Sequence, residues 1–121
     1  MSAMIRSFVL GLAVAASLWA GRAFPQQAPA AFAAFSACHS SDGANGVGPT
    51  LKGIYGRKSG AVGGFAYSRA MRTAGLTWDE KSLDSFLTDP QKAIPGNHMP
   101  FPGVSDAKQR ADVIDYLKTV K

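Results

Sequence analysis

Residues 35–39 read Phe35-Ser36-Ala37-Cys38-His39. Cys38 is the only cysteine in 121 residues, so no disulfide can form within the chain. A Cys-His pair ends the pattern Cys-x-x-Cys-His, in which thioether bonds tether a haem and the histidine ligates its iron. Phe35 stands where that pattern has its first cysteine. Alone, the pair is weak evidence, because most Cys-His pairs are a buried thiol beside a surface histidine.

A second stretch, residues 95–103, reads PGNHMPFPG and places Met99 among prolines and glycines. Methionine is usually core filler. Here the flanking residues restrict the backbone, as is required to aim a thioether sulfur at a metal. A thioether and an imidazole on opposite faces of haem iron leave no position for a substrate and favour the ferrous state. The combination of His39 and Met99 therefore indicates electron transfer rather than oxygen chemistry.

The N-terminal residues 1–23 have the layout of an export signal. Arg6 precedes an uncharged run from Phe8 to Ala20, and small residues surround a cleavage position after Ala23. The run is shorter than the about 20 residues that a membrane-spanning helix needs. We expect residues 1–23 to be a signal peptide and residues 24–121 to be one mature domain in the periplasm. If the signal is retained, it would anchor the same domain to the membrane.

The charge of the chain is mildly positive. Because residues 1–23 contain two arginines and no acidic residue, the net charge falls from +5 for the whole chain to +3 for residues 24–121. A charge of this sign favours docking on an acidic face of a partner protein. The aromatic residues do not interleave with the lysines and arginines, so the pattern expected of a nucleic-acid binder is missing.

Hydrophobic periodicity predicts three or four short helices and no strand. The expected helices cover residues 30–39, 67–73, 78–88 and 105–120, with Ser105 as the cap of the last. Residues 40–64 are rich in glycine, and residues 94–103 contain three prolines and two glycines, so both are expected to be loops. Such a small domain has a thin core of its own. A large apolar cofactor would complete it.

Together these features resemble a class I cytochrome c of the soluble bacterial and mitochondrial branch. The resemblance spans about Phe32 to Lys118. It also rests on the segments Gly48-Pro49-Thr50-Leu51, Phe65-Ala66-Tyr67-Ser68, Asp89-Pro90 and Tyr116-Leu117-Lys118. It implies a small all-α fold wrapped around one haem c. The implied function is a monomeric one-electron carrier between respiratory or photosynthetic redox proteins, not an enzyme.

The resemblance also implies a role for each site residue. Cys38 would form a single thioether, His39 would be the proximal iron ligand and would donate to the Pro49 carbonyl, and Met99 would be the distal ligand. A buried haem propionate needs donors or a counter-charge. The implied donors and apolar haem contacts are Arg57, Tyr67 and Trp78 for the propionate, Leu51 and Leu87 for the faces, and Phe101 for the edge.

Phe35 is the main departure from the family pattern. It resembles the arrangement in single-thioether cytochromes of some protists, and neither axial ligand depends on it. Phe86 stands where the family often has a tyrosine that hydrogen-bonds the ligand methionine. Three alternatives remain open: a poorly loaded or degenerate cytochrome, a haem subunit or peroxidase-like protein in which Met99 dissociates, and a colourless exported domain with a free thiol at Cys38.

Overall fold

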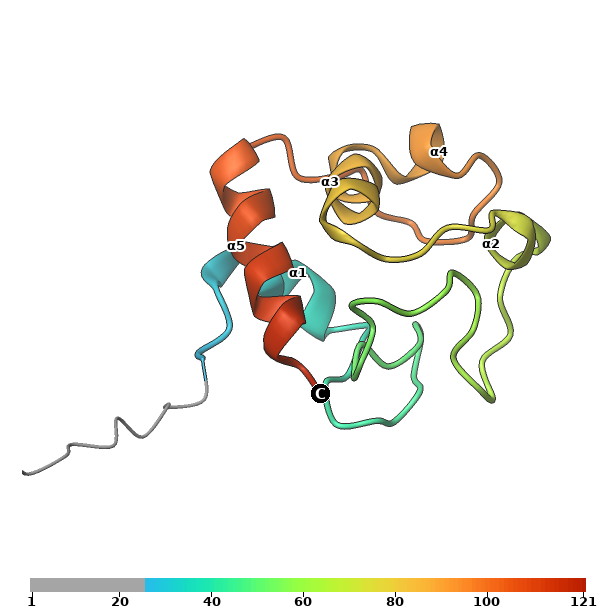
Figure 1. The fold of residues 1–121 in the computed structure, drawn as a ribbon, viewed down its shortest axis with the longest axis horizontal. Helices are drawn as coiled ribbons and strands as arrows, with labels where there is room; N and C mark the ends of the chain where they lie inside the picture. The colour runs from blue at the N-terminus through green and yellow to red at the C-terminus, as the bar shows by residue number, and fades with distance from the viewer. Residues whose placement is uncertain (1–25) are drawn as a thin grey trace, which may run out of the picture.

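The computed structural model describes residues 26–121, which form short helices joined by long loops (Figure 1). In chain order the helices are the 3-10 turn η1 (Ala30–Phe32), α1 (Ala33–Ser36), α2 (Arg69–Thr73), α3 (Glu80–Thr88), α4 (Pro90–Ala93) and α5 (Ala107–Thr119). Within residues 26–121 the only β-type pairing is an isolated antiparallel bridge between Lys58 and Thr77. The expected all-α fold is therefore confirmed.

Helix α3 begins at a capping box. The Asp79 carboxylate accepts a hydrogen bond from the Ser82 amide at 2.8 Å, and the Ser82 hydroxyl accepts one from the Asp79 amide at 2.9 Å. These two bonds satisfy amides that a helix N-terminus otherwise leaves unpaired. The helix buries Leu83, Phe86 and Leu87 on one side. It thereby presents an apolar face to the centre of the molecule.

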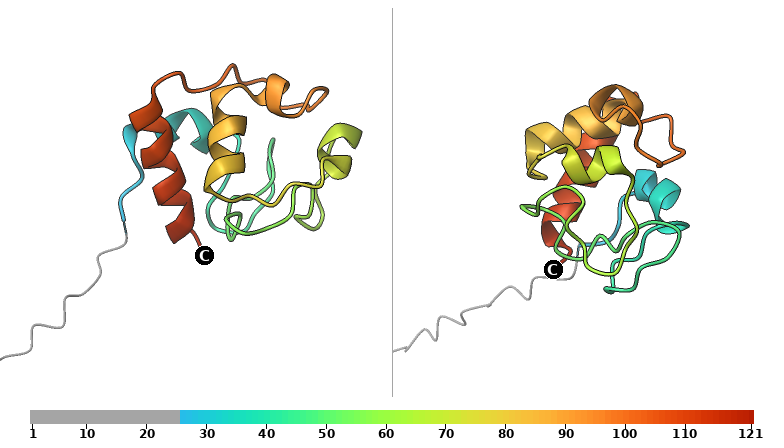
Figure 2. Two further views of the ribbon diagram at one scale, coloured as in Figure 1. Left: turned by 45° about the horizontal axis from the view of Figure 1, so that its top comes forward. Right: turned by 90° about the vertical axis from the view of Figure 1, so that its right-hand side faces the viewer.

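Helix α5 lies beside α3, and η1 packs on it, with α1 continuing from η1 (Figures 1 and 2). Its buried face consists of Val113, Ile114 and Leu117, at the spacing of one helical stripe. The ring of Phe32 in η1 meets the ring of Tyr116 edge-on, with 4.7 Å between the centroids. This contact joins the two ends of the described chain.

The loops between α1 and α2 close the side of the molecule that α3 and α4 leave open, in the lower part of Figure 1. Backbone hydrogen bonds hold them to distant segments. The Gly53 amide donates to the Val120 carbonyl at 2.8 Å, and the Trp78 amide donates to the Arg57 carbonyl at 2.9 Å. The glycine-rich residues 40–64 are thus held in place against the interior of the molecule.

Several boundaries differ from the sequence predictions. The first helix ends at Ser36 rather than His39, and α5 is capped by Asp106 rather than Ser105, since the Asp106 carboxylate accepts from the Gln109 amide at 2.8 Å. Pro90 ends α3 as expected but also starts α4, so residues 26–121 contain five α-helices rather than three or four. Proline suits a first helical position because it lacks an N–H.

Two remaining features concern the membrane and the expected signal. Among residues 26–121 there is no helix of the length and hydrophobicity that crossing a bilayer requires. The expected signal peptide, residues 1–23, lies outside the described residues.

Candidate functional site

A central cavity of about 360 Å³ lies between the helices and the wrapping loops. This volume falls in the range of about 300–1,000 Å³ that is typical of cofactor sites. Its walls contain no aspartate, glutamate, lysine or arginine, and they include the buried side chains of Ile54, Trp78, Leu83, Phe86 and Leu87. A cavity of this size and polarity suits a large, mainly apolar group.

His39 lies at the wall of this cavity with a fixed ring orientation. Its Nδ1 lies 2.7 Å from the Pro49 carbonyl oxygen. A carbonyl can only accept, so Nδ1 carries the proton and Nε2 keeps its lone pair. This is the tautomer and the outer hydrogen bond that a metal-ligating histidine uses. The bond predicted between His39 and Pro49 is present.

Gly48 keeps the His39 ring in place by its lack of a side chain. A Cβ at this position would lie 2.7 Å from Nδ1 and 2.9 Å from Nε2 of His39, closer than real Cβ contacts allow. The Gly48 amide donates to the Cys38 carbonyl at 2.8 Å. The backbone of Gly48 is therefore tied to the Cys38–His39 segment and packs directly on the imidazole.

Thr50 and Asn45 shape the loop that carries Pro49. Thr50 is buried, and its hydroxyl oxygen accepts from the Gly43 amide at 3.1 Å and from the Lys52 amide at 3.2 Å. The Asn45 side chain accepts from the Thr50 amide and donates to the Gly63 carbonyl, each at 3.0 Å. These bonds fix the carbonyl that orients His39.

Met99 lines the same cavity from the loop after α4 and is half-buried. The neighbouring Asn97 is buried and holds this loop. Its amide nitrogen donates to the carbonyls of Pro90 at 2.8 Å and Ile94 at 2.9 Å, and its side-chain oxygen accepts from the Met99 amide at 2.9 Å. The backbone of Met99 is thus attached to α4 through one side chain.

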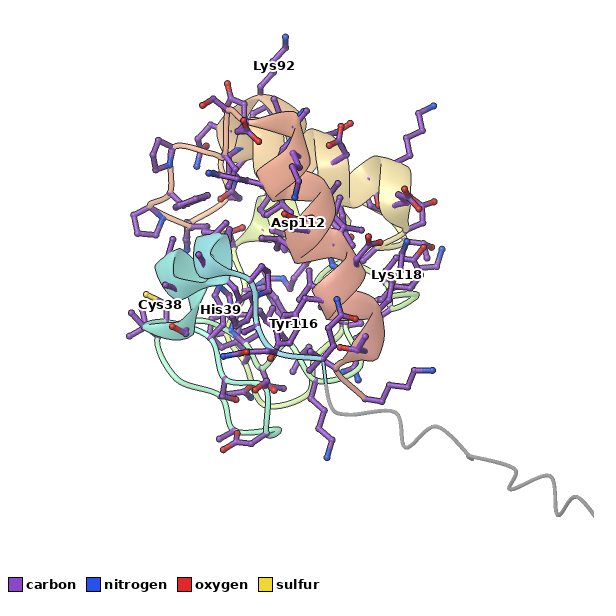
Figure 3. The ribbon with its side chains drawn as sticks, turned by 90° about the vertical axis from the view of Figure 1, so that its left-hand side faces the viewer. Cys38, His39, Lys92, Asp112, Tyr116 and Lys118 are labelled. Carbon is purple, nitrogen blue, oxygen red and sulfur yellow. The ribbon has the colours of Figure 1, made fainter. Side chains whose placement is uncertain are left out.

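Cys38 follows α1 at the cavity wall, next to His39 (Figure 3). It is half-buried and its thiol is free. Phe35, one helical turn earlier, is buried, and its ring centroid lies 4.8 Å from that of Phe101 in the Met99 loop. The position of the first cysteine of the pattern is therefore filled by a ring that contacts the Met99 loop.

Tyr67 and Trp78 supply polar groups at the cavity wall. The Tyr67 hydroxyl oxygen accepts from the Val62 amide at 3.2 Å, so its own proton remains available for donation. Burial raises the pKa of the Tyr67 phenol, while the Val62 amide and the charge of Arg57 oppose that shift. Trp78 is buried, with its ring centroid 5.1 Å from that of Phe86.

The structure gathers nearly all of the sequence-predicted site residues at this cavity. The residues that line it are Cys38, His39, Pro49, Leu51, Tyr67, Trp78, Leu87, Met99 and Phe101. Arg57 does not line it: its guanidinium lies 3.5 Å from the Lys52 carbonyl oxygen.

Sequence reasoning missed the roles of Gly48 and Asn97. Both lie within stretches that the sequence had singled out, beside Pro49 and Met99 respectively. The signal was weak, since a glycine in a glycine-rich loop and an asparagine in a turn have ordinary local explanations. Only the position of the His39 ring shows why residue 48 has no side chain.

The cavity combines apolar walls with a fixed imidazole, a methionine and a half-buried cysteine, as the site of a small haem-binding cytochrome requires. Residues 30–121 match the family "Cytochrome c". The chain therefore belongs to the cytochrome c family. It is an electron carrier with one covalently bound haem c rather than an enzyme. Cys38 is the only cysteine of the chain, so it is the one residue that could form a thioether to the haem.

Three relatives illustrate the similarity. The chain is 50% identical over 95 residues to "Cytochrome c2 iso-2" of Magnetospirillum molischianum, which covers 78% of this chain and 98% of the relative. It is 49% identical over 85 residues to "Cytochrome c" of Euglena viridis, covering 69% and 83%. The solved structure of cytochrome cH from Methylobacterium extorquens matches with a TM-score of 0.71 and 52% identity, covering 74% of this chain and 91% of that one.

Proposed function

We propose that the chain carries one electron at a time on a haem c whose iron is held by His39 and Met99. The observation that carries this proposal is the 2.7 Å hydrogen bond from His39 Nδ1 to the Pro49 carbonyl, which leaves Nε2 as the free ligand atom. Met99 lines the same cavity on a loop that Asn97 fixes. The haem supplies the centre that gains and loses the electron.

The other cavity residues would hold and shield the group. Leu51, Leu87 and Phe101 provide apolar contact, which keeps water from the iron and favours the less charged ferrous state. The Tyr67 hydroxyl and the Trp78 indole N–H are donors suited to a buried propionate. Arg57 would supply the counter-charge, and its charge already acts on Tyr67.

The proposed setting is the periplasm. In this proposal residues 1–23 are an export signal, and a retained signal would tether the domain to the membrane instead. The partners are redox proteins of the same compartment, and the net charge of +3 on residues 24–121 favours partners with acidic groups. The carrier would work as a monomer.

An absorption spectrum of the exported protein, taken before and after acid extraction of non-covalent haem, tests the proposal. We expect a low-spin reduced spectrum and colour that stays with the chain. In Cys38→Ala the haem should bind but extract freely. In Met99→Ala the ferrous protein should bind carbon monoxide, which the unmodified protein should not.

Two outcomes would contradict the proposal. Haem that extracts freely from the unmodified protein would mean that Cys38 forms no thioether. Carbon monoxide binding by the unmodified ferrous protein at neutral pH would mean that Met99 does not ligate the iron firmly, as expected of a peroxidase-like protein.

A further inference from the structure

The opening of the haem cavity is marked by lining residues whose side chains are exposed. These residues are Ala34, Val47, Ala66, His98 and Pro100. Val47 is 77% exposed, the highest value among the large hydrophobic side chains of the described residues. We call these five residues the rim. No member of the rim is an aspartate, glutamate, lysine or arginine.

The chain on either side of each rim residue is also uncharged. Residues 26–41, 43–51, 59–68 and 93–105 contain no aspartate, glutamate, lysine or arginine, and together they include the whole rim. The charges that bound residues 43–51 are Asp42 and Lys52, which have opposite sign. The Ala44 amide and the Ser40 hydroxyl lower the pKa of Asp42, and Lys52 adds to this effect.

No lysine or arginine of residues 26–121 lines the cavity. Lys118 bonds Glu80 at 3.0 Å and Asp115 at 3.1 Å on the side formed by α3 and α5. Arg72 donates to the Tyr67 carbonyl at 2.8 Å. Figure 3 shows Lys92 projecting from α4, away from Cys38 and His39. None of these side chains lines the cavity.

From this arrangement we propose that the redox partner contacts the rim through an uncharged, apolar face. The inference rests on the proposed function, since it assumes that electrons cross at the cavity opening. A charged partner face placed on the rim would lose hydration without gaining an opposite charge. An apolar face would gain from the burial of Val47 and its neighbours. The net charge of +3 then acts on the approaching partner only at long range.

Electron self-exchange between ferrous and ferric copies of the holoprotein tests the proposal. One copy loses an electron and the other gains it, and each copy presents its own rim, which stands in for the uncharged partner face. Nuclear magnetic resonance line widths of mixed samples give the rate. Each copy carries a net charge of +3, so the rate should rise with salt, but less steeply than in a variant with a charge added to the rim.

Two variants with the same net charge locate the contact. Ala34→Lys places a charge on the rim of both copies, and the low-salt rate should fall about tenfold and recover in high salt. Ser85→Lys places the same charge at an exposed position on α3 that does not line the cavity, and the rate should stay within about twofold of the unmodified protein. Val47→Lys repeats the rim test on a different segment.

Each other outcome overturns the inference. A rise of the unmodified rate with salt as steep as that of Ala34→Lys would reveal a charged contact face and favour a partner that docks through acidic groups. Equal effects of Ala34→Lys and Ser85→Lys would show that the rim is not the contact. A stable dimer in sedimentation would assign the rim to a second copy. Failure of the proposed function would be distinguishable, because the protein would then show no reversible haem reduction at all.

Discussion

The rings of Phe35 and Phe101 lie against each other across the cavity wall, with 4.8 Å between their centroids. Phe35 belongs to the segment that carries Cys38 and His39, whereas Phe101 belongs to the loop that carries Met99. Phe32 extends the contact, with its centroid 6.0 Å from Phe35 and 4.7 Å from Tyr116 of α5. A row of aromatic rings therefore connects the segments of His39 and Met99 to the C-terminal helix, at the position where the pattern Cys-x-x-Cys-His has its first cysteine.

Phe35→Ala tests whether this contact positions Met99. Removal of a buried phenylalanine side chain should lower the free energy of unfolding by about 3–5 kcal/mol. Because Phe101 loses its neighbour, the Met99 loop should also loosen. We expect a weaker far-red absorption band of the Met-ligated ferric haem, measured under conditions where the variant is folded.

Phe35→Leu is the matched control, since it keeps much of the volume but not the ring. It should retain more of both stability and the far-red band than Phe35→Ala does. If Phe35→Ala is destabilised while its band is unchanged at every pH and temperature of the folded range, Phe35 only fills the core and does not position Met99.

Gly48→Ala should disturb the proximal ligand. The added Cβ would lie 2.7 Å from His39 Nδ1, so the ring or the loop must move. We expect the hydrogen bond to Pro49 to lengthen and the reduction potential to shift, as measured by voltammetry. Gly63→Ala makes the same chemical change where nothing lies within 4 Å of the added atom, and it should leave the potential unchanged. Equal potentials for both variants would show that Gly48 does not constrain the ring.

Asn97→Ala should detach the Met99 loop from α4. The change removes three hydrogen bonds at a buried side chain and leaves the Met99 amide without its partner, whereas the Pro90 and Ile94 carbonyls still accept from backbone amides. Each buried group left unpaired costs about 1–3 kcal/mol, less where water can reach it. We expect an unfolding free energy lower by about 2–4 kcal/mol and easier displacement of Met99 by added imidazole, measured by titration.

Gln91→Ala serves as the comparison for Asn97→Ala. Gln91 is exposed, and it donates to the Asn97 carbonyl at 2.8 Å without touching Met99. It should weaken the loop less. If both variants bind imidazole as weakly as the unmodified protein, the Met99 loop does not depend on Asn97.

The fold was predictable from local patterns because each long helix carries its apolar residues on one face. Leu83, Phe86 and Leu87 alone indicate the buried side of α3. The ends of helices were less predictable. Ser105 and Asp106 are adjacent and both can cap a helix, so only the backbone geometry decides that Asp106 does so. The one-turn helix α4 has too few residues for any periodicity.

The site was predictable from motifs only where a side chain acts directly. His39 and Met99 stand out because of their chemistry, whereas Gly48 acts by having no side chain and Asn97 acts through backbone groups. The sequence alone also did not show that charged side chains are absent from the cavity lining. None of Lys52, Lys92 and Arg72 lines the cavity. Which residues share a surface depends on long-range packing, and this packing cannot be read from the sequence alone.

The Asp79 cap of α3 should make stability depend on pH in a defined direction. Hydrogen bonds from the Ser82 amide and hydroxyl hold the pKa of the Asp79 carboxyl below its ordinary value of 3.8. A lowered native pKa means that the ionised cap stabilises the fold fully above 3.8, and that this contribution is lost as the pH falls through the lower native value.

Asp79→Asn separates the charge from the cap, because asparagine caps helices about as well as aspartate. Near neutral pH the unmodified protein should have the higher urea midpoint, since a negative charge at a helix N-terminus is favourable. As the pH falls below 3.8 the two midpoints should converge, because the carboxyl then becomes neutral as well. Both proteins contain the same His39, so acid loss of the haem ligand affects them equally and cancels in the difference. A gap that persists unchanged in acid would show that the charge of Asp79 does not contribute to the stability of α3.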